Sequence, residues 1–232
     1  MIVVMEPPAS FADQLADAAR SMQGWASTQL TLEKVVLVAT EIIQGCDLVG
    51  ISIVHSDRID TPVGSNERLN RIDELQFVLK EGPCFDALRM HEVVNSADLA
   101  NDRRWPRWGP LISKETGVSS IVSYRLYTTR DTLGAMNLYS TDLNAFDADD
   151  ITNGHALAAH VGVALAASQN AEHLEMAILN RTVIGRAEGI LMERFGLTPD
   201  QAFAVLRRVS QSSNVKLNRV AEELVLTGQT PT

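Results

Sequence analysis

The sequence has few cysteines and no long apolar run. The chain of 232 residues contains two cysteines, Cys46 and Cys84, and their spacing fits neither a metal site nor a disulfide framework. No apolar segment approaches the roughly 20 residues that a membrane-spanning helix needs. The first six residues also lack the basic region of a secretory signal. These absences predict a soluble protein of the reduced cytoplasm with no membrane segment.

Sequence motifs of catalysis and metal binding are missing as well. The chain has no Gly-rich phosphate loop, no His-Glu metal motif and no nucleophile elbow. His155 and His160 are five residues apart on a predicted helix, whereas a helical metal-binding pair is four apart. Cys84 follows Gly82-Pro83 at a predicted helix N-terminus, where a redox or nucleophilic role is conceivable. A place in a core or pocket is favoured, because no His or Asn accompanies this cysteine in a recognisable signature. The sequence therefore predicts no catalytic residue, no metal and no cofactor.

The charge is distributed unevenly along the chain. The formal net charge is −9, and residues 1–170 carry all of it, because residues 171–232 are neutral. Within residues 179–221, basic side chains exceed acidic ones by four. Such a local excess suits contact with a phosphate backbone, although it equally fits an ordinary solvated surface.

The first part of the chain mixes helical and strand patterns. Apolar spacing predicts helices over residues 9–22, 31–45, 66–79 and 83–90, the second with Thr31 as its N-cap, and a turn over residues 61–65. Short β-branched or alternating segments predict strands over residues 48–55, 93–94, 119–129 and 131–140, the last two forming a hairpin. Because the helices and strands do not alternate regularly, we expect an α+β domain around an antiparallel sheet, ending near residue 147.

From Asp147 onward the pattern changes to a long helix. Proline is absent between residues 111 and 198, and residues 150–195 read as helix, about 67 Å long at about 1.5 Å per residue. An imperfect heptad of apolar and small residues follows this helix: Leu157, Val161, Ala164, Ser168, Ala171, Leu174, Ile178 and Arg181. This stripe favours dimerisation through the helix, and the alternative is that the helix packs back on its own domain.

Two shorter helices with clear boundary signals close the chain. Gly196 ends the long helix, and Thr198 to Gln201 forms a capping box for a helix reaching about Gln211. Ser213 or Asn214 is expected to cap a final helix over residues 215–226, which Gly228 ends. Gly185 and Gly189 each cost about 1 kcal/mol relative to Ala inside a helix. We expect them to make room for the two following helices.

The closing segment resembles the ANTAR domain of transcription antitermination regulators. The resemblance rests on the run from Arg181 to Arg194 (RTVIGRAEGILMER), on Leu197-Thr-Pro-x-x-Ala-Phe203, and on the segment from Leu206 to Ala221. The preceding part is similar to a GAF domain of the actinobacterial GAF-ANTAR type, through Asp73-Glu-Leu-Gln76, residues 81–87 and 104–108, and Leu133 to Tyr139. The resemblance implies an α+β fold: a GAF-like antiparallel-sheet domain over residues 1–150, a connecting long helix over 151–171, and an all-α three-helix ANTAR domain over 172–232.

The resemblance also implies a function. ANTAR domains act as dimers on paired stem-loops in nascent leader RNA, and holding the second stem-loop prevents a competing terminator hairpin. By position, the implied RNA contacts are Arg181, Arg186, Arg207, Ser210, Gln211, Asn214 and Lys216. Many ANTAR domains have Lys where this chain has Glu188, and an acidic group there would weaken attraction to phosphate.

Two questions stay open from the sequence. The GAF-like part can hold an unidentified small-molecule effector or none; the candidate pocket residues are Cys84, Trp105, Trp108, Tyr124 and Tyr139. The closing helices also fit a DNA-binding regulator, since three short helices can present a helix-turn-helix. The glycines of the long helix and the family motifs favour RNA.

Overall fold

The computed structural model describes residues 10–22, 27–54, 59–63, 67–89, 93–129 and 131–229. The chain divides into two compact units, one up to Gln169 and one from Asn170 onward. One helix, α6 (Ala148–Phe195), contributes residues to both units. Each unit is described by itself.

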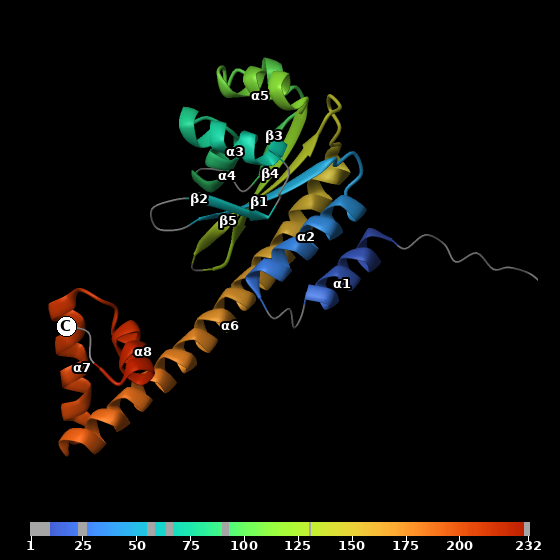
Figure 1. The fold of residues 1–232 in the computed structure, drawn as a ribbon. Helices are drawn as coiled ribbons and strands as arrows, with labels where there is room; N and C mark the ends of the chain where they lie inside the picture. The colour runs from blue at the N-terminus through green and yellow to red at the C-terminus, as the bar shows by residue number, and fades with distance from the viewer. Residues whose placement is uncertain are drawn as a thin grey trace, which may run out of the picture. The chain divides into compact units, whose positions relative to one another are not determined.

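An antiparallel sheet of five strands forms the centre of the first unit (Figure 1). Its strands are β1 (Leu48–Val54), β2 (Ile59–Val63), β3 (Val93–Ser96), β4 (Ser120–Tyr127) and β5 (Thr132–Ser140), in the order β2-β1-β5-β4-β3. The β4–β5 hairpin places Tyr124 opposite Met136, and β5 pairs along its other edge with β1. The expected α+β fold around an antiparallel sheet is confirmed.

Side chains alternate between the two faces of the sheet, and each face has its own core. On one face, Ile51 and Ile53 of β1 and Leu138 of β5 pack with α1 (Phe11–Met22), α2 (Thr28–Ile42) and the beginning of α6. On the other face, Ile121 and Tyr139 pack with α3 (Glu67–Leu79) and α5 (Trp108–Thr116), and α4 (Pro83–Arg89) joins this layer through Ala87. The unit is therefore three layers deep, with helices covering both faces (Figure 1).

Several boundaries differ from the sequence prediction. The N-cap of α2 is Ser27, whose side chain accepts a hydrogen bond from the Leu30 amide, and Thr31 lies one turn inside the helix. The expected turn over residues 61–65 is wrong for residues 61–63, which form the end of β2, and residues 64 and 65 lie outside the described residues. The prediction missed both the 3-10 turn η1 (Leu99–Asn101) and helix α5.

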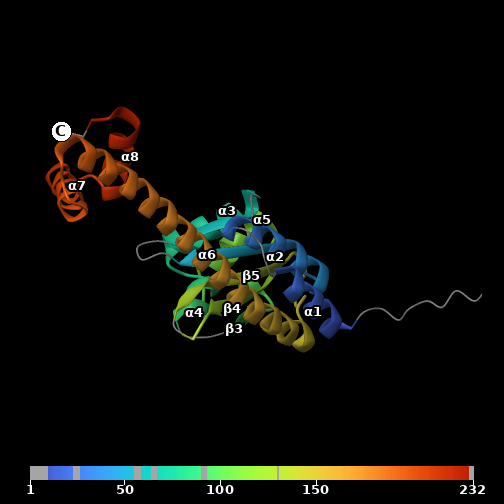
Figure 2. The same ribbon diagram turned by 90° about the horizontal axis from the view of Figure 1, so that it is seen from below.

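The first third of α6 belongs to the core of the first unit. Asp147 begins the helix, because one of its carboxylate oxygens accepts the amide protons of Asp149 and Asp150. Leu157, Val161 and Leu165 are fully buried against the sheet and α2. Thr28 of α2 and Ser168 of α6 are in hydrogen-bond contact at 3.4 Å, and α2 lies beside this part of α6 in both views (Figures 1 and 2).

The heptad stripe therefore changes environment along the helix. Its first members, from Leu157 to Ser168, pack on their own unit, as the alternative interpretation held. Its later members, including Leu174 and Ile178, are exposed. Only the later part is available to a second chain.

The second unit is a three-helix module made of the end of α6, α7 (Pro199–Ser213) and α8 (Leu217–Thr227). Its buried core consists of Ala187, Leu191, Ala202, Leu206, Val220, Ala221 and Leu224. The predicted capping box is confirmed, because Thr198 accepts from the Gln201 amide and the Gln201 side chain accepts from the Thr198 amide. Gly228 ends α8 in the left-handed conformation, as expected.

The connection between α7 and α8 corrects a second cap prediction. Asn214 ends α7 in the left-handed conformation, at φ 53°, and its amide donates to the Ser210 carbonyl. Helix α8 begins after Lys216, which makes no capping hydrogen bond through its side chain. Asn is among the residues that tolerate this backbone region, so Asn214 closes one helix and does not open the next.

The two glycines of α6 also differ from expectation. A Cβ atom built on Gly185 or Gly189 would meet nothing within 4 Å outside the helix's own backbone, and both residues are exposed. The expectation that they make room for α7 and α8 is wrong, because those helices pack on Ala187 and Leu191, on another side of α6. Over the described residues, no helix is long and apolar enough to cross a membrane, and no cluster of potential ligands could hold a metal ion.

Candidate functional site

The first unit contains a cavity of about 360 Å³ on the face of the sheet that carries α3 and α4. Its lining residues come from β1, β2, α3 and α4: Ser52, Asp60, Thr61, Asn70, Asp73, Glu74, Gln76, Phe77, Val78, Cys84 and Phe85. This volume lies at the lower end of the range of small-molecule sites. The cavity is the candidate sensing site.

A chain of polar side chains crosses the sheet beneath this cavity. The Ser123 hydroxyl donates to Asn137 Oδ1 at 2.6 Å, and Asn137 Nδ2 donates to the Ser52 hydroxyl at 3.2 Å. The Thr61 and Ser52 hydroxyls are in hydrogen-bond contact at 3.4 Å, so the chain runs through four neighbouring strands. Ser52, Ser123 and Asn137 are all buried. Buried polar groups that satisfy one another in this way define a single arrangement of the cavity floor.

Gln76 joins the two helices that form the walls of the cavity. Its side-chain oxygen accepts the Cys84 amide proton at 3.1 Å, and its side-chain nitrogen donates to Asp73 at 3.3 Å. Gly82 accommodates the approach, because a Cβ atom there would lie 2.2 Å from the Gln76 oxygen. Gln76 therefore holds the start of α4 against α3, and with it the two cavity walls.

The carboxyl group of Asp73 is the most perturbed acid of the cavity. Its removal from solvent raises the pKa of Asp73 to about 6, while hydrogen bonds from Thr61 and Gln76 act in the opposite direction. At neutral pH the Asp73 carboxylate is therefore ionised in a buried position, and burial disfavours the charged form. Perturbed acids in a cavity are typical of functional sites.

The two thiols are not activated. Burial raises the pKa of Cys84 to about 12, and hydrogen bonds to Ser52 and Asn137 offset this only in part. Burial likewise raises the pKa of Cys46 to about 12. Because the thiolate is the reactive form, the helix N-terminus at Cys84 does not create a nucleophile, and this cysteine lines the cavity as a small apolar residue.

The five residues that the sequence suggested for a pocket have different places. Cys84 lines the cavity, and Tyr139 lies next to it, since both Asp73 and Cys84 act electrostatically on the Tyr139 hydroxyl. Trp105 and Trp108 belong to the core behind the cavity and meet edge to face, with ring centroids 5.7 Å apart. Tyr124 is buried in the core on the opposite face of the sheet.

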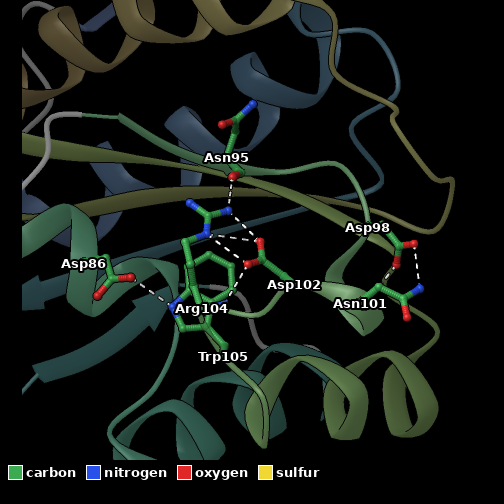
Figure 3. A network of polar contacts seen from close by, with 7 residues as sticks. All are labelled: Asp86, Asn95, Asp98, Asn101, Asp102, Arg104 and Trp105. Carbon is green, nitrogen blue, oxygen red and sulfur yellow. Dashed lines mark hydrogen bonds and ion pairs between the residues drawn. The ribbon is translucent and has the colours of Figure 1, made fainter.

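A polar network ties the loop before α5 to the cavity wall (Figure 3). The Trp105 indole donates to Asp86 of α4 at 2.9 Å, and the Arg104 guanidinium lies 4.5 Å from the centre of the Trp105 ring. Arg104 also binds Asp102 and the Asn95 carbonyl, so a single side chain bridges the loop, β3 and the indole. This network fixes α4, which carries two of the lining residues.

The sequence did not predict most of the lining residues. One signal was present at Ser52, a polar residue that interrupts the apolar strand Leu48–Val54. Asp73 to Gln76 entered the prediction only through the resemblance to GAF domains. The cavity itself arises from the packing of α3 and α4 against β1 and β2, which no local pattern encodes.

The second unit concentrates exposed polar and basic groups around the turn between α7 and α8. The Ser210 hydroxyl donates to the Val215 carbonyl at 2.6 Å, and the Val215 amide donates back to the Ser210 carbonyl at 3.2 Å. These bonds close the turn and place Lys216 beside the end of α7. Of the residues proposed to contact RNA, Arg207, Gln211, Asn214 and Lys216 are exposed here, whereas Ser210 is occupied within the turn.

A side-chain contact draws α6 toward the same end of the module. Asn218 Nδ2 donates to Asn180 Oδ1 at 3.0 Å, which joins α8 to α6 next to Arg181. Asn218 is two residues after Lys216, so this contact also brings Arg181 near the start of α8. Arg186 is exposed farther along α6, and Glu188 is half-buried on that helix.

An exposed stripe of uncharged residues runs along α6. Residues at spacings of three and four lie along it, and each is exposed: Ala171, Leu174, Ile178, Thr182, Gly185 and Gly189. Leu174 and Ile178 expose 64% and 57% of their surface. Hereafter this set is called the α6 stripe.

Comparisons with known proteins agree with this division. The family model of the GAF domain matches residues 26–166, and that of the ANTAR domain matches residues 172–225. No curated protein sequence matches the chain significantly.

Solved structures resemble the first unit. The GAF domain of an Acinetobacter phosphoenolpyruvate-protein phosphotransferase superposes with a TM-score of 0.54 at 14% identity, covering 73% of this chain and 99% of that one. A free methionine-R-sulfoxide reductase from Neisseria meningitidis, solved with its substrate, gives 0.53 at 16% identity with the same coverage. At these identities the likeness shows the fold alone.

Proposed function

The chain belongs to the GAF-ANTAR family of regulators, and from this premise we propose that it binds paired stem-loops in nascent leader RNA as a dimer in response to a signal. Holding the second stem-loop would prevent the terminator hairpin from forming, so transcription would continue. The GAF and ANTAR parts are regulatory domains. Because the proposed target is nascent RNA, we place this activity in the cytoplasm.

The observation that carries the RNA-binding proposal is the cluster at the α7–α8 turn. Arg207 and Lys216 supply positive charge for phosphates, and Gln211 and Asn214 supply amides that can pair with unstacked bases. The turn holds these groups on a rigid connection, because its hydrogen bonds are satisfied internally. Rigid presentation reduces the entropy lost on binding.

Dimerisation is proposed through the α6 stripe. Leu174 and Ile178 are large apolar residues left exposed on a helix, and the stripe continues beyond them as Thr182, Gly185 and Gly189. A second copy of α6 could approach closely at the glycines, which have no side chains. A dimer of this kind would present two ANTAR modules, one for each of the paired stem-loops.

RNA binding is tested with a salt series on the full chain. Removing two phosphate contacts with Arg207→Ala and Lys216→Ala should weaken binding to paired-hairpin RNA about 10- to 100-fold and lower the salt slope by about 2. Filter binding or gel shift measures both quantities. Arg20→Ala with Lys114→Ala removes the same two residue types from exposed positions of the first unit and should leave RNA binding unchanged.

The same experiment decides against the alternative function. A DNA-binding regulator would prefer duplex DNA of equal length over hairpin RNA at every salt concentration. Equal loss of binding in the control pair would show that only net charge matters, and the α7–α8 turn would then have no special role.

The glycines give an independent test of the dimer. Because nothing surrounds their absent side chains, Gly189→Ala should stabilise the second unit by about 0.5–1 kcal/mol through helix propensity alone. The same methyl group should weaken the dimer if a second helix approaches there. Thermal unfolding measures the first effect and sedimentation the second. If Gly189→Ala is more stable and dimerises as strongly as the unmodified protein, the two α6 helices approach each other closely at another position.

A further inference from the structure

The cavity of the first unit has a negative electrostatic character. Its lining includes the carboxylates of Asp60, Asp73 and Glu74, and none of its described lining residues is Lys or Arg. Glu74 is already paired with Arg71 at 2.8 Å, and Arg71 is held as well by Glu115. Asp73 therefore supplies the buried negative charge of the lining, and an anionic ligand such as a nucleotide phosphate would be repelled.

Among the residues that the structure describes, no cation compensates the charge of Asp73 inside the cavity. The groups that face this carboxyl are Thr61 of β2, Gln76 of its own helix, the Cys84 thiol of α4 and the Tyr139 hydroxyl of β5, and none of them is a cation. Burial raises the pKa of Asp73 to about 6, so its ionisation weakens the folded state at neutral pH. A charge kept at a cost to stability is typical of a site shaped for binding.

A second observation marks the same place. The Tyr139 hydroxyl is completely buried and makes no hydrogen bond within the part of the chain that the structure describes. The titratable groups that act on it are Asp73 and Cys84, both of which line the cavity. An unpaired buried hydroxyl is uncommon in folded proteins, so this part of the core has an unmet polar group close to the charged lining.

The remaining wall is apolar. Phe77 and Val78 line the cavity with side chains that are 57% and 65% exposed overall. Phe85 is half-buried beside Cys84, and the Arg89 guanidinium lies 5.5 Å from its ring centre. Aromatic faces attract cations as well as hydrocarbon. The lining thus combines an acidic, hydrogen-bonding end with an aromatic end.

We propose that this cavity binds a small organic cation, a primary ammonium on an apolar body, with Asp73 as its counter-ion and with Phe77 and Phe85 against its apolar part. The N–H donors of the ammonium match the acceptor oxygens that Asp73 and Thr61 present at the cavity. The inference rests on the sensing part of the proposed function and names the chemistry of its signal.

Isothermal titration of the full chain with three molecules of equal size tests this proposal. The probes are 2-phenylethylamine, 2-phenylethanol and phenylacetate, which differ in charge but hardly in shape. The amine should bind with a Kd of about 1 mM or tighter, the alcohol about tenfold more weakly and the carboxylate not measurably. Equal binding of all three, preference for the carboxylate, or no binding of the amine would each overturn the proposal.

Asp73→Asn separates the charge from the shape of the site. It should weaken amine binding at least about tenfold while the unfolding temperature stays equal or rises, since a disfavoured buried charge is removed. Glu33→Gln removes an exposed carboxylate of α2, outside the cavity, and should leave binding unchanged. Equal amine affinity in Asp73→Asn would refute the assignment.

The pH dependence has a defined sign. The folded-state pKa of Asp73, about 6, lies above its ordinary value of 3.8, so its contribution to stability is largest below about pH 4 and is lost as pH rises through 6. Amine affinity should run the opposite way, increasing as Asp73 ionises. These measurements use no RNA, so their failure is distinguishable from a failure of RNA binding.

Discussion

Replacing Leu174 and Ile178 by Glu is expected to convert the protein to a monomer and to weaken binding to paired stem-loop RNA about 100-fold or more. Both side chains are more than half exposed and lie four residues apart on the α6 stripe. A dimer would bury them, and two carboxylates per chain in that contact would be desolvated and would repel their symmetry mates. Binding to one stem-loop would then no longer raise the effective concentration of the other module.

The same helix offers a matched control. Met176 and Leu179 expose 55% and 57% of their surface and point to another side of α6 than Leu174 and Ile178. Met176→Glu with Leu179→Glu therefore adds the same charge to the same helix, on another face. Sedimentation and RNA binding should be normal in this pair. Dissociation of the control pair alone would move the interface to that other face, and a dimer in both would place it outside this segment.

Trp108→Ala is expected to lower the free energy of unfolding of the first unit by about 3–5 kcal/mol. The side chain is completely buried, and its indole donates to the Ile72 carbonyl of α3 at 3.3 Å. Its amide donates to Glu81, which also accepts from the Arg107 amide and thereby caps the start of α5. The substitution would leave a large void between α3, α5 and the sheet, which side-chain movements could fill only in part.

Two optical signals separate the two units in this measurement. All three tryptophans precede residue 109, so their fluorescence reports on the first unit alone, whereas circular dichroism reports on helices throughout the chain. Fluorescence in denaturant should show an early transition, and the helical signal should keep a later component from α7 and α8. Trp108→Phe retains most of the side-chain volume, so its free energy of unfolding should fall much less than that of Trp108→Ala. An unchanged midpoint for Trp108→Ala would mean that this core contributes little to stability.

Sequence patterns predicted the elements that depend on local chemistry. Thr198, Pro199 and Gln201 form a capping box wherever they occur at the start of a helix, so this boundary was predictable. The β4–β5 hairpin and α6 were also predicted, because their signals extend over many residues. The errors at Thr31 and Asn214 concern caps, where two or three neighbouring polar residues were equally suitable.

Burial of the long helix could not be read from its sequence. Leu157 and Leu174 belong to one apolar series, yet the first is fully buried by its own sheet and the second is exposed. A heptad pattern shows which side of a helix is apolar, but it does not show which element or chain packs against that side. The same limit applies to the glycines. Helix propensity shows that Gly185 and Gly189 destabilise the helix, but it does not show which neighbouring element needs the space.

The sequence by itself determined the order of the two domains, the acidic first part and the basic closing helices, because composition and periodic patterns are properties of consecutive residues. Only the tertiary structure decided where the sensing cavity lies. Ser52, Thr61, Asp73 and Cys84 come from four separate elements and meet only after α3 and α4 pack on the sheet. The free energy of such a site depends on which groups lose water together, and that depends on the folded arrangement and not on their spacing along the chain.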